Sequence, residues 1–251
     1  MKIMSDNQEL LTMEESNPFL TSKVERKQDT RDCRVLFLYP NERGMSTIPP
    51  SITTLSQILK DEGHDTSIFD TTFYKFDDEL TVEDPDVLDT QTLNVRPVLD
   101  IDDDDLHFKK TTRSAVDDFR KVILDYKPDI IAVSCTETTF LRGIELIKQT
   151  KDMGILNIFG GVFPTFAPDL VLNYKEVDML CVGEGENAII DLANSISNKE
   201  DYSNVTNLWI RQKDGTIIKN SISRPVDINK LPPLTDVGLF GEDRFYRPMG
   251  G

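Results

Sequence analysis

The sequence predicts an α/β domain built on a doubly wound, five-stranded parallel sheet. Short apolar runs of strand length alternate with longer segments in which apolar residues recur at helical spacing. The run DIIAVSC, residues 129–135, is apolar throughout, as expected of a parallel strand that helices cover on both faces. Five strand–helix units in succession favour a sheet wrapped by helices on both sides.

The first unit begins where the pattern becomes regular. RVLFLYP, residues 34–40, predicts the first strand, and DTSIFD, residues 65–70, predicts the second. The segment between them has apolar residues at helical spacing. Ser51 is the expected N-cap of this helix, and Gly63 is its expected stop.

The remaining units follow the same alternation. Apolar runs predict three further strands, at residues 129–135, 155–161 and 177–183. Apolar periodicity predicts four further helices, at residues 115–129, 140–154, 167–176 and 184–197.

Composition divides the chain into segments. Residues 1–32 are predicted to be a polar, disordered leader, and residues 33–199 form the sheet domain, with an acidic insertion at residues 71–110. The favoured interpretation of this insertion is a solvated excursion of like charges; a lid or a contact to another domain is the alternative. Residues 200–226 predict a β-hairpin, because Asp-Gly separates two β-like runs. Residues 227–251, rich in Pro and Gly, predict a connector to a C-terminal domain missing from this chain.

The overall composition excludes several classes of partner. With a net charge of -16 over 251 residues, the surface repels phosphate backbones, so no nucleic acid partner is expected. No apolar stretch approaches the roughly 18 to 20 residues of a membrane span, and no membrane contact or secretory signal is expected. Three widely separated cysteines predict a reducing, cytoplasmic compartment rather than a disulfide framework.

Ligands of such sheets bind at the carboxyl ends of the strands. After the first strand, a long loop carries Ser46; a ligand contact and an ordinary connecting loop are equally compatible with it. After the third strand, four of six residues carry hydroxyls, among them Ser134, Thr136 and Thr138. Hydroxyls can bond a ligand, whereas N-capping of the next helix accounts for only one of them.

Two neighbouring strands end in glycine-rich loops. After the fourth strand, Gly160 and Gly161 remove side chains where the backbone passes close to another group, and Pro164 and Thr165 follow. After the fifth strand, the loop contains Gly183, Glu184 and Gly185 in succession. Either pair alone is weak evidence. Together they predict a groove deep enough for a bulky, partly apolar cofactor.

Side chains suited to catalysis are few. Of the two histidines, His64 is favoured as a structural residue at a helix end, and His107 lies in the acidic insertion. Neither Cys nor His residues have metal-ligand spacing, and no nucleophile elbow or phosphate-binding Gly-Lys-Ser/Thr loop is present. No catalytic or metal-binding residue is therefore assigned, and any chemistry is expected from a cofactor or another domain.

Taken together, these motifs resemble the N-terminal cobalamin-binding domain of cobalamin-dependent radical SAM proteins. The most specific part is GGVFPT followed by VDMLCVGEGE, and the connector LPPL…FYRPMGG is also similar. The resemblance covers roughly residues 33–251 and implies a Rossmann-like or flavodoxin-like fold with cobalamin across the carboxyl ends of the strands. The cobalamin contacts that it implies are Ser46, Ser134, Thr136, Thr138, Gly160, Gly161, Pro164, Thr165, Gly183, Glu184 and Gly185.

The resemblance also implies what the complete protein does. Cobalamin would be presented as a methyl carrier to a radical SAM domain in cis. A 4Fe-4S cluster and S-adenosylmethionine are expected only if that domain exists. This chain lacks the Cys-x-x-x-Cys-x-x-Cys motif that holds the cluster, so it is expected to bind the cofactor without catalysing a reaction. It is either a fragment or a stand-alone module.

Two further departures concern histidine. Phe163 stands where the family often has histidine, so this side chain can only pack. The Asp-x-His-x-x-Gly motif that supplies a cobalt ligand in cobalamin mutases is missing, because the similar stretch around His107 ends in lysine and lies in another loop.

Two other functions are compatible with the same sheet. One is a cofactor-free interaction or regulatory domain of flavodoxin-like topology, in which the glycine loops are purely structural. A weaker one is a nucleotide- or flavin-binding domain, for which the sequence has no fingerprint.

Overall fold

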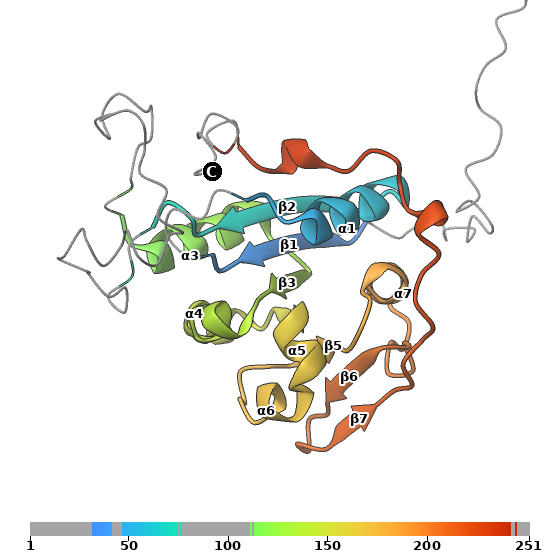
Figure 1. The fold of residues 1–251 in the computed structure, drawn as a ribbon. Helices are drawn as coiled ribbons and strands as arrows, with labels where there is room; N and C mark the ends of the chain where they lie inside the picture. The colour runs from blue at the N-terminus through green and yellow to red at the C-terminus, as the bar shows by residue number, and fades with distance from the viewer. Residues whose placement is uncertain are drawn as a thin grey trace, which may run out of the picture.

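The computed structural model describes residues 32–41, 47–74, 76, 111, 113–241 and 244. A seven-stranded sheet in the order β2-β1-β3-β4-β5-β6-β7 runs through this part of the chain (Figure 1). The predicted α/β class is confirmed. The strands are β1 (Arg34–Tyr39), β2 (Asp65–Asp70), β3 (Ile130–Ser134), β4 (Leu156–Gly160), β5 (Met179–Cys181), β6 (Leu208–Arg211) and β7 (Ile217–Lys219).

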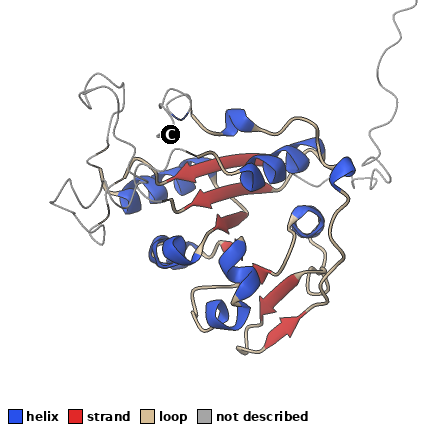
Figure 2. Ribbon diagram, in the orientation of Figure 1, coloured by secondary structure: helices blue, strands red, loops and turns tan. Residues whose placement is uncertain are grey.

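Helices cover both faces of the sheet (Figure 2). α1 and α7 pack on one face, and α3 and α4 pack on the other. The α-helices are α1 (Pro50–Asp61), α3 (Ala115–Tyr126), α4 (Glu137–Lys148), α5 (Val162–Phe166), α6 (Pro168–Leu172) and α7 (Glu186–Asn198). Short 3-10 helices are η1 (Lys151–Met153), η2 (Ile228–Lys230) and η3 (Val237–Leu239).

The two layers follow from the two-residue period of a strand. In β1, Val35 and Phe37 point into the core under α1 and α7. Leu36 and Leu38 point into the opposite core under α3 and α4. All four are almost fully buried, which explains why the strand is a continuous apolar run rather than an alternating one.

The sheet has two more strands than the sequence predicts. β1 to β5 are parallel, as expected. The hairpin around Asp214-Gly215 is confirmed, but its first strand, β6, pairs antiparallel with β5 and so continues the sheet. Pairing of β6 with β5 satisfies backbone groups that a five-stranded sheet would leave at an exposed edge.

One predicted helix cap is wrong. α1 begins at Pro50, and its N-cap residue is Pro49, with no side-chain cap from Ser51. A proline at the first helical position needs no partner for an amide hydrogen and has the right φ angle. Gly63 follows the end of the helix with a φ of +80°, as predicted for a stop. The short helix α5 was not expected from the sequence.

Some predictions concern parts of the chain outside the described residues. These are nearly all of the leader at 1–32 and most of the insertion at 71–110, with His107. Within the described part, no helix has both the length and the hydropathy that a membrane crossing requires.

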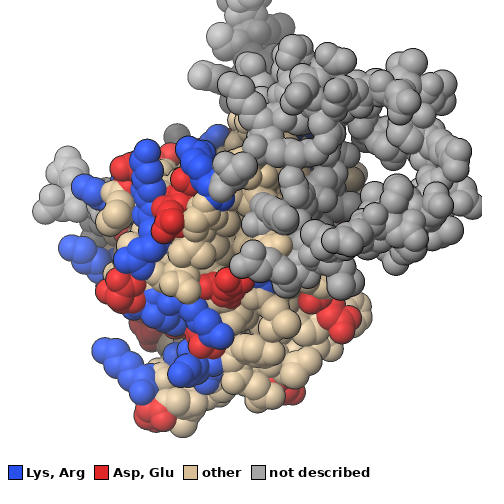
Figure 3. All heavy atoms as spheres, turned by 90° about the vertical axis from the view of Figure 1, so that its left-hand side faces the viewer, with Lys and Arg blue, Asp and Glu red and all other residues tan. Residues whose placement is uncertain are grey.

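Charges of both signs lie on the side of the molecule formed by α3 and α4. Figure 3 shows Lys and Arg interspersed with Asp and Glu there. Two ion pairs join neighbouring elements: Arg120 of α3 lies 3.0 Å from Asp152 of η1, and Lys151 of η1 lies 2.6 Å from Asp178, just before β5. Arg120 and Lys151 are therefore each paired with a carboxylate.

We expect Asn157→Ala to lower the free energy of unfolding by about 1 to 3 kcal/mol, because it leaves buried polar groups unpaired. The Asn157 side chain is 1% exposed, donates to the Glu176 carbonyl at 3.0 Å and accepts from the Asp178 amide at 3.1 Å. Urea denaturation measures the change. Asn173→Ala, at an exposed position, is the control and should change stability by less than about 0.5 kcal/mol.

Candidate functional site

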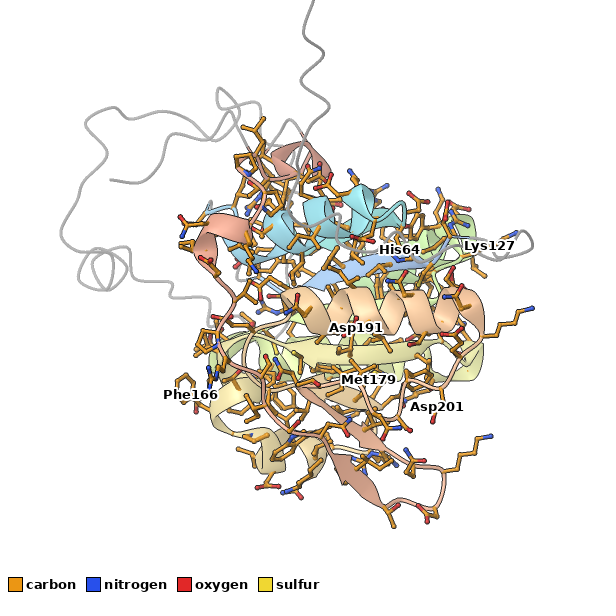
Figure 4. The ribbon with its side chains drawn as sticks, turned by 90° about the vertical axis from the view of Figure 1, so that its right-hand side faces the viewer. His64, Lys127, Phe166, Met179, Asp191 and Asp201 are labelled. Carbon is orange, nitrogen blue, oxygen red and sulfur yellow. The ribbon has the colours of Figure 1, made fainter. Side chains whose placement is uncertain are left out.

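A cavity of about 200 Å³ lies between the sheet and the helix pair α1 and α7. Figure 4 shows these two helices side by side on this face. The strand order changes direction between β1 and β3, and ligands of doubly wound sheets bind beside such a point. The cavity is lined by Phe37, Ser51, Ile52, Leu55, Ala132, Val133, Ser134, Ile158, Gly160, Gly161, Cys181, Gly183, Glu184, Gly185, Glu186, Ala188 and Ile189.

The floor of the cavity is formed by the sheet and is open because of Gly160. This residue ends β4, and a Cβ added to it would meet no atom within 4 Å. Phe37, Ala132 and Ile158 from three neighbouring strands complete the floor. Any side chain at position 160 would extend into space that is now free.

Gly161 has a different role, which is to let two backbone segments approach each other. Its φ is +109°, a conformation that L side chains rarely adopt, and an added Cβ would lie 2.6 Å from the carbonyl oxygen of Cys135. The Cys135 amide donates to the Gly160 carbonyl at 3.0 Å. The loops after β3 and β4 are therefore held against each other through backbone atoms.

The loop after β5 is fixed by contacts on both sides. Gly183 has a φ of +87°, and its amide donates to the Thr165 hydroxyl at 3.2 Å. The Glu184 carbonyl accepts from the Asn207 side chain at 2.7 Å, and the Glu184 carboxylate accepts from the Val226 amide. Gly185 is the N-cap residue of α7. These contacts orient the first turn of α7 toward the cavity.

The chemistry of the lining is mainly apolar, with carboxylates on one side. Glu184 and Glu186 both line the cavity, at the start of α7. Burial, and secondly the charge of Glu186, raises the pKa of the Cys181 thiol to about 12. Burial likewise raises the pKa of Cys135 to about 12. Both thiols are therefore protonated at neutral pH; Cys181 adds apolar surface to the cavity lining rather than a nucleophile, and Cys135 packs in the core on the other face of the sheet.

Six of the eleven residues predicted from the sequence lie together in the lining. They are Ser134, Gly160, Gly161, Gly183, Glu184 and Gly185. Ser46 lies outside the described residues. The role of each in cofactor binding stays a prediction.

The other four predicted residues lie outside the cavity lining. Thr136 is the N-cap of α4 and forms a capping box with Thr139, so capping accounts for it. Thr138 lies beside it, with 3.1 Å between the two hydroxyl oxygens of Thr136 and Thr138. Pro164 is buried in α5, and Thr165 is engaged by the Gly183 amide.

Sequence reasoning missed the helical side of the cavity. Ser51 and Leu55 from α1, and Ala188 and Ile189 from α7, form its wall. Apolar residues at helical spacing predict a helix without showing which of them face a cavity. The sequence signal for this wall is Gly185, the N-cap residue of α7. A Cβ added there would lie 3.6 Å from Leu55 and would narrow the gap between α1 and α7.

The histidine and phenylalanine predictions agree with the structure. His64 is 4% exposed and accepts from the Cys33 amide at 3.3 Å. It lies at the end of the sheet away from Phe166 (Figure 4). Phe163 packs on Phe140, with 5.0 Å between ring centroids. In the part of the chain that the structure describes, no three His, Cys, Asp or Glu side chains are grouped as a metal site would require.

The structure shows an α/β domain with a cavity beside the switch point of the sheet, and comparisons with known proteins show what it is similar to. Residues 99–193 match the protein family described as B12 binding domain; this span is less than half of the 251 residues. No curated protein matches the sequence.

Solved structures share the fold. OxsB, a cobalamin-dependent S-adenosylmethionine radical enzyme with aqua-cobalamin bound, matches with a TM-score of 0.57 and 17% identity. TsrM from Kitasatospora setae, a radical S-adenosylmethionine methyltransferase, matches with a TM-score of 0.53 and 16% identity. The alignments cover 86% and 75% of this chain, but only 26% of OxsB and 30% of TsrM. These structures show a shared fold, and together with the B12 binding domain match over residues 99–193 they confirm the predicted resemblance to the cobalamin-binding domain of cobalamin-dependent radical SAM proteins.

The two adjacent glycines provide a matched pair of substitutions. We expect Gly161→Ala to lower the free energy of unfolding by at least about 1 kcal/mol, because alanine is strained at this φ and clashes with the Cys135 carbonyl. Gly160→Ala, where the new methyl group enters open space, should leave stability within about 0.5 kcal/mol. Urea denaturation tests both. Equal losses for the two variants would contradict the separate roles of these glycines.

The thiols should be unreactive in the folded protein. All three cysteines are buried and form no disulfide, and the pKa of Cys135 and that of Cys181 are raised to about 12. At pH 8 we expect alkylation by iodoacetamide to be at least about 100-fold slower than for the same protein in urea, because the thiolate is the reacting form. Mass spectrometry of each cysteine peptide over time measures this rate. Rapid labelling of Cys181 in the folded protein would contradict the burial described above.

Proposed function

We propose that this chain is a cobalamin-binding module that presents the cofactor to a radical SAM domain of a longer protein. The observation that carries the proposal is the cavity between α1, α7 and the sheet, with a floor that Gly160 leaves open. The B12 binding domain match over residues 99–193 supports the same ligand class.

The residues present fit this group. The apolar floor and helical wall suit the aromatic base of the nucleotide tail, which gains from leaving water. Because the loops after β4 and β5 are rich in glycine, they present backbone rather than side chains at the carboxyl edge of the sheet. The larger corrin would lie at this edge. In this proposal Gly160 and Leu55 contact the tail, and Ser134 with Gly161 lies nearer the corrin.

The same lining disfavours a dinucleotide or flavin nucleotide. The carboxylates of Glu184 and Glu186 stand at the start of α7, where a nucleotide-binding fold would place phosphates. Two negative groups there oppose a pyrophosphate more strongly than they oppose the single phosphodiester of cobalamin.

The proposed role in the complete protein extends beyond this chain. Bound cobalamin would supply a methyl carrier, and the 4Fe-4S cluster and S-adenosylmethionine would be held by the radical SAM domain. The described residues hold and shield the cofactor, with their three buried thiols kept reduced in the cytoplasm. His64, at the opposite end of the sheet, provides no imidazole to the cavity (Figure 4).

The test is binding of hydroxocobalamin. We expect the purified chain to retain a corrin absorption spectrum after desalting and Gly160→Val to weaken binding at least about 10-fold, because its methyl groups occupy the cavity. Leu124→Ala, at a 61% exposed position on α3, is the control and should bind normally. Wild-type protein that emerges colourless would reject the proposal and favour the cofactor-free interaction domain.

A further inference from the structure

The segment after β7 returns across the sheet and packs on the outside of the cavity wall. We call residues 227–240 the strap. In Figure 1 it leaves the hairpin, passes α7 and crosses to α1 and β2, far from β7 in the sheet order. It includes the short helices η2 and η3, and η3 contacts both α1 and β2. A connector that only linked two domains would not need these contacts.

Asp236 is the central contact of the strap with α1. Its amide donates to the Thr53 carbonyl at 3.0 Å. Its carboxylate accepts from the Ser56 hydroxyl and from the Lys60 ammonium, both at 2.6 Å. Ser56 is fully buried, and its hydroxyl is also 2.7 Å from the Thr66 hydroxyl on β2. The network therefore joins the strap, α1 and the edge strand.

The end of the strap is anchored in the core on the same face. Phe240 is 2% exposed and contacts the ring of Tyr39 edge-to-face, with 6.2 Å between centroids. Just beyond it, Arg244 lies 3.1 Å from Asp70 in a buried ion pair and donates to the Thr47 carbonyl at 3.0 Å. Thr47 precedes α1, so the anchor holds the approach to the helix as well as the helix itself.

The strap and the cavity use different residues of one helix. Ser51, Ile52 and Leu55 of α1 line the cavity. Thr53 and Ser56 bond to the strap. Because a helix moves as a rigid unit over such a short distance, displacement of the strap must change the freedom of the cavity wall.

We propose that the strap positions α1 for the ligand, so that docking of the strap and occupancy of the cavity are thermodynamically coupled. Asp236 is the positioning residue. The inference rests on cobalamin as the occupant proposed above. Coupling is reciprocal: a docked strap tightens ligand binding, and bound ligand holds the strap more firmly by the same factor. The strap thereby links the cavity to any domain that follows it in the chain.

The first experiment measures hydroxocobalamin affinity in variants of Asp236. Asp236→Ala should weaken binding at least about 5-fold, the lower end of usual coupling factors. Asp236→Asn keeps an acceptor for the Ser56 hydroxyl and should recover part of that loss. Asp227→Ala is the matched control, because Asp227 lies on the same strap and its carboxylate accepts from the backbone amide and the side-chain amide of Asn229 rather than from α1. It should bind as the wild type does.

The second experiment needs no variant. Saturating hydroxocobalamin should slow hydrogen exchange of the Asp236 amide at least about 5-fold, since this amide bonds to α1. Unchanged exchange, or equal affinities of wild type and Asp236→Ala, would overturn the coupling while leaving cobalamin binding intact. A wild-type protein that binds no hydroxocobalamin would overturn the proposed function and the coupling together.

Discussion

The close approach of Gly161 to the carbonyl of Cys135 is the constraint on which the site depends. Any side chain there would push the loops after β3 and β4 apart, because an added Cβ would meet that oxygen at 2.6 Å. With the loops together, β3 and β4 end level with each other, and Ser134 pairs with Gly160 in the register. The floor of the cavity is formed at this level edge.

The four glycines in the cavity lining have two different structural roles, and the sequence pattern alone does not distinguish them. They are Gly160, Gly161, Gly183 and Gly185. Gly161 and Gly183 are required by backbone conformation, since both have φ values that disfavour side chains. Gly160 and Gly185 have no such need. Gly160 faces open space, and Gly185 faces Leu55 across an ordinary contact distance. Two glycines thus shape the loops, and two keep the cavity and its mouth clear.

Local patterns predicted much of the fold, because parallel strands and amphipathic helices are encoded by spacing within a short window. The features that were missed depend on distant residues. The sequence near Trp209 indicates a strand but not its pairing with β5. The hydroxyls of Thr136 and Thr138 matched a ligand pattern, yet Thr136 serves the helix cap. The cavity wall on α1 and α7 reads as ordinary core, since apolar lining and apolar packing look alike in sequence.

The strap is the clearest example of a contact that local sequence patterns cannot predict. Ser56 and Asp236 are 180 positions apart, and neither residue type is unusual in its own segment. Their contact arises only when the chain, having completed the sheet at β7, returns to the edge strand β2. The first helix of the domain is thereby held by its last segment. The cavity between α1 and α7 is then bounded by elements from both ends of the fold, and its shape depends on the contact of α1 with the strap.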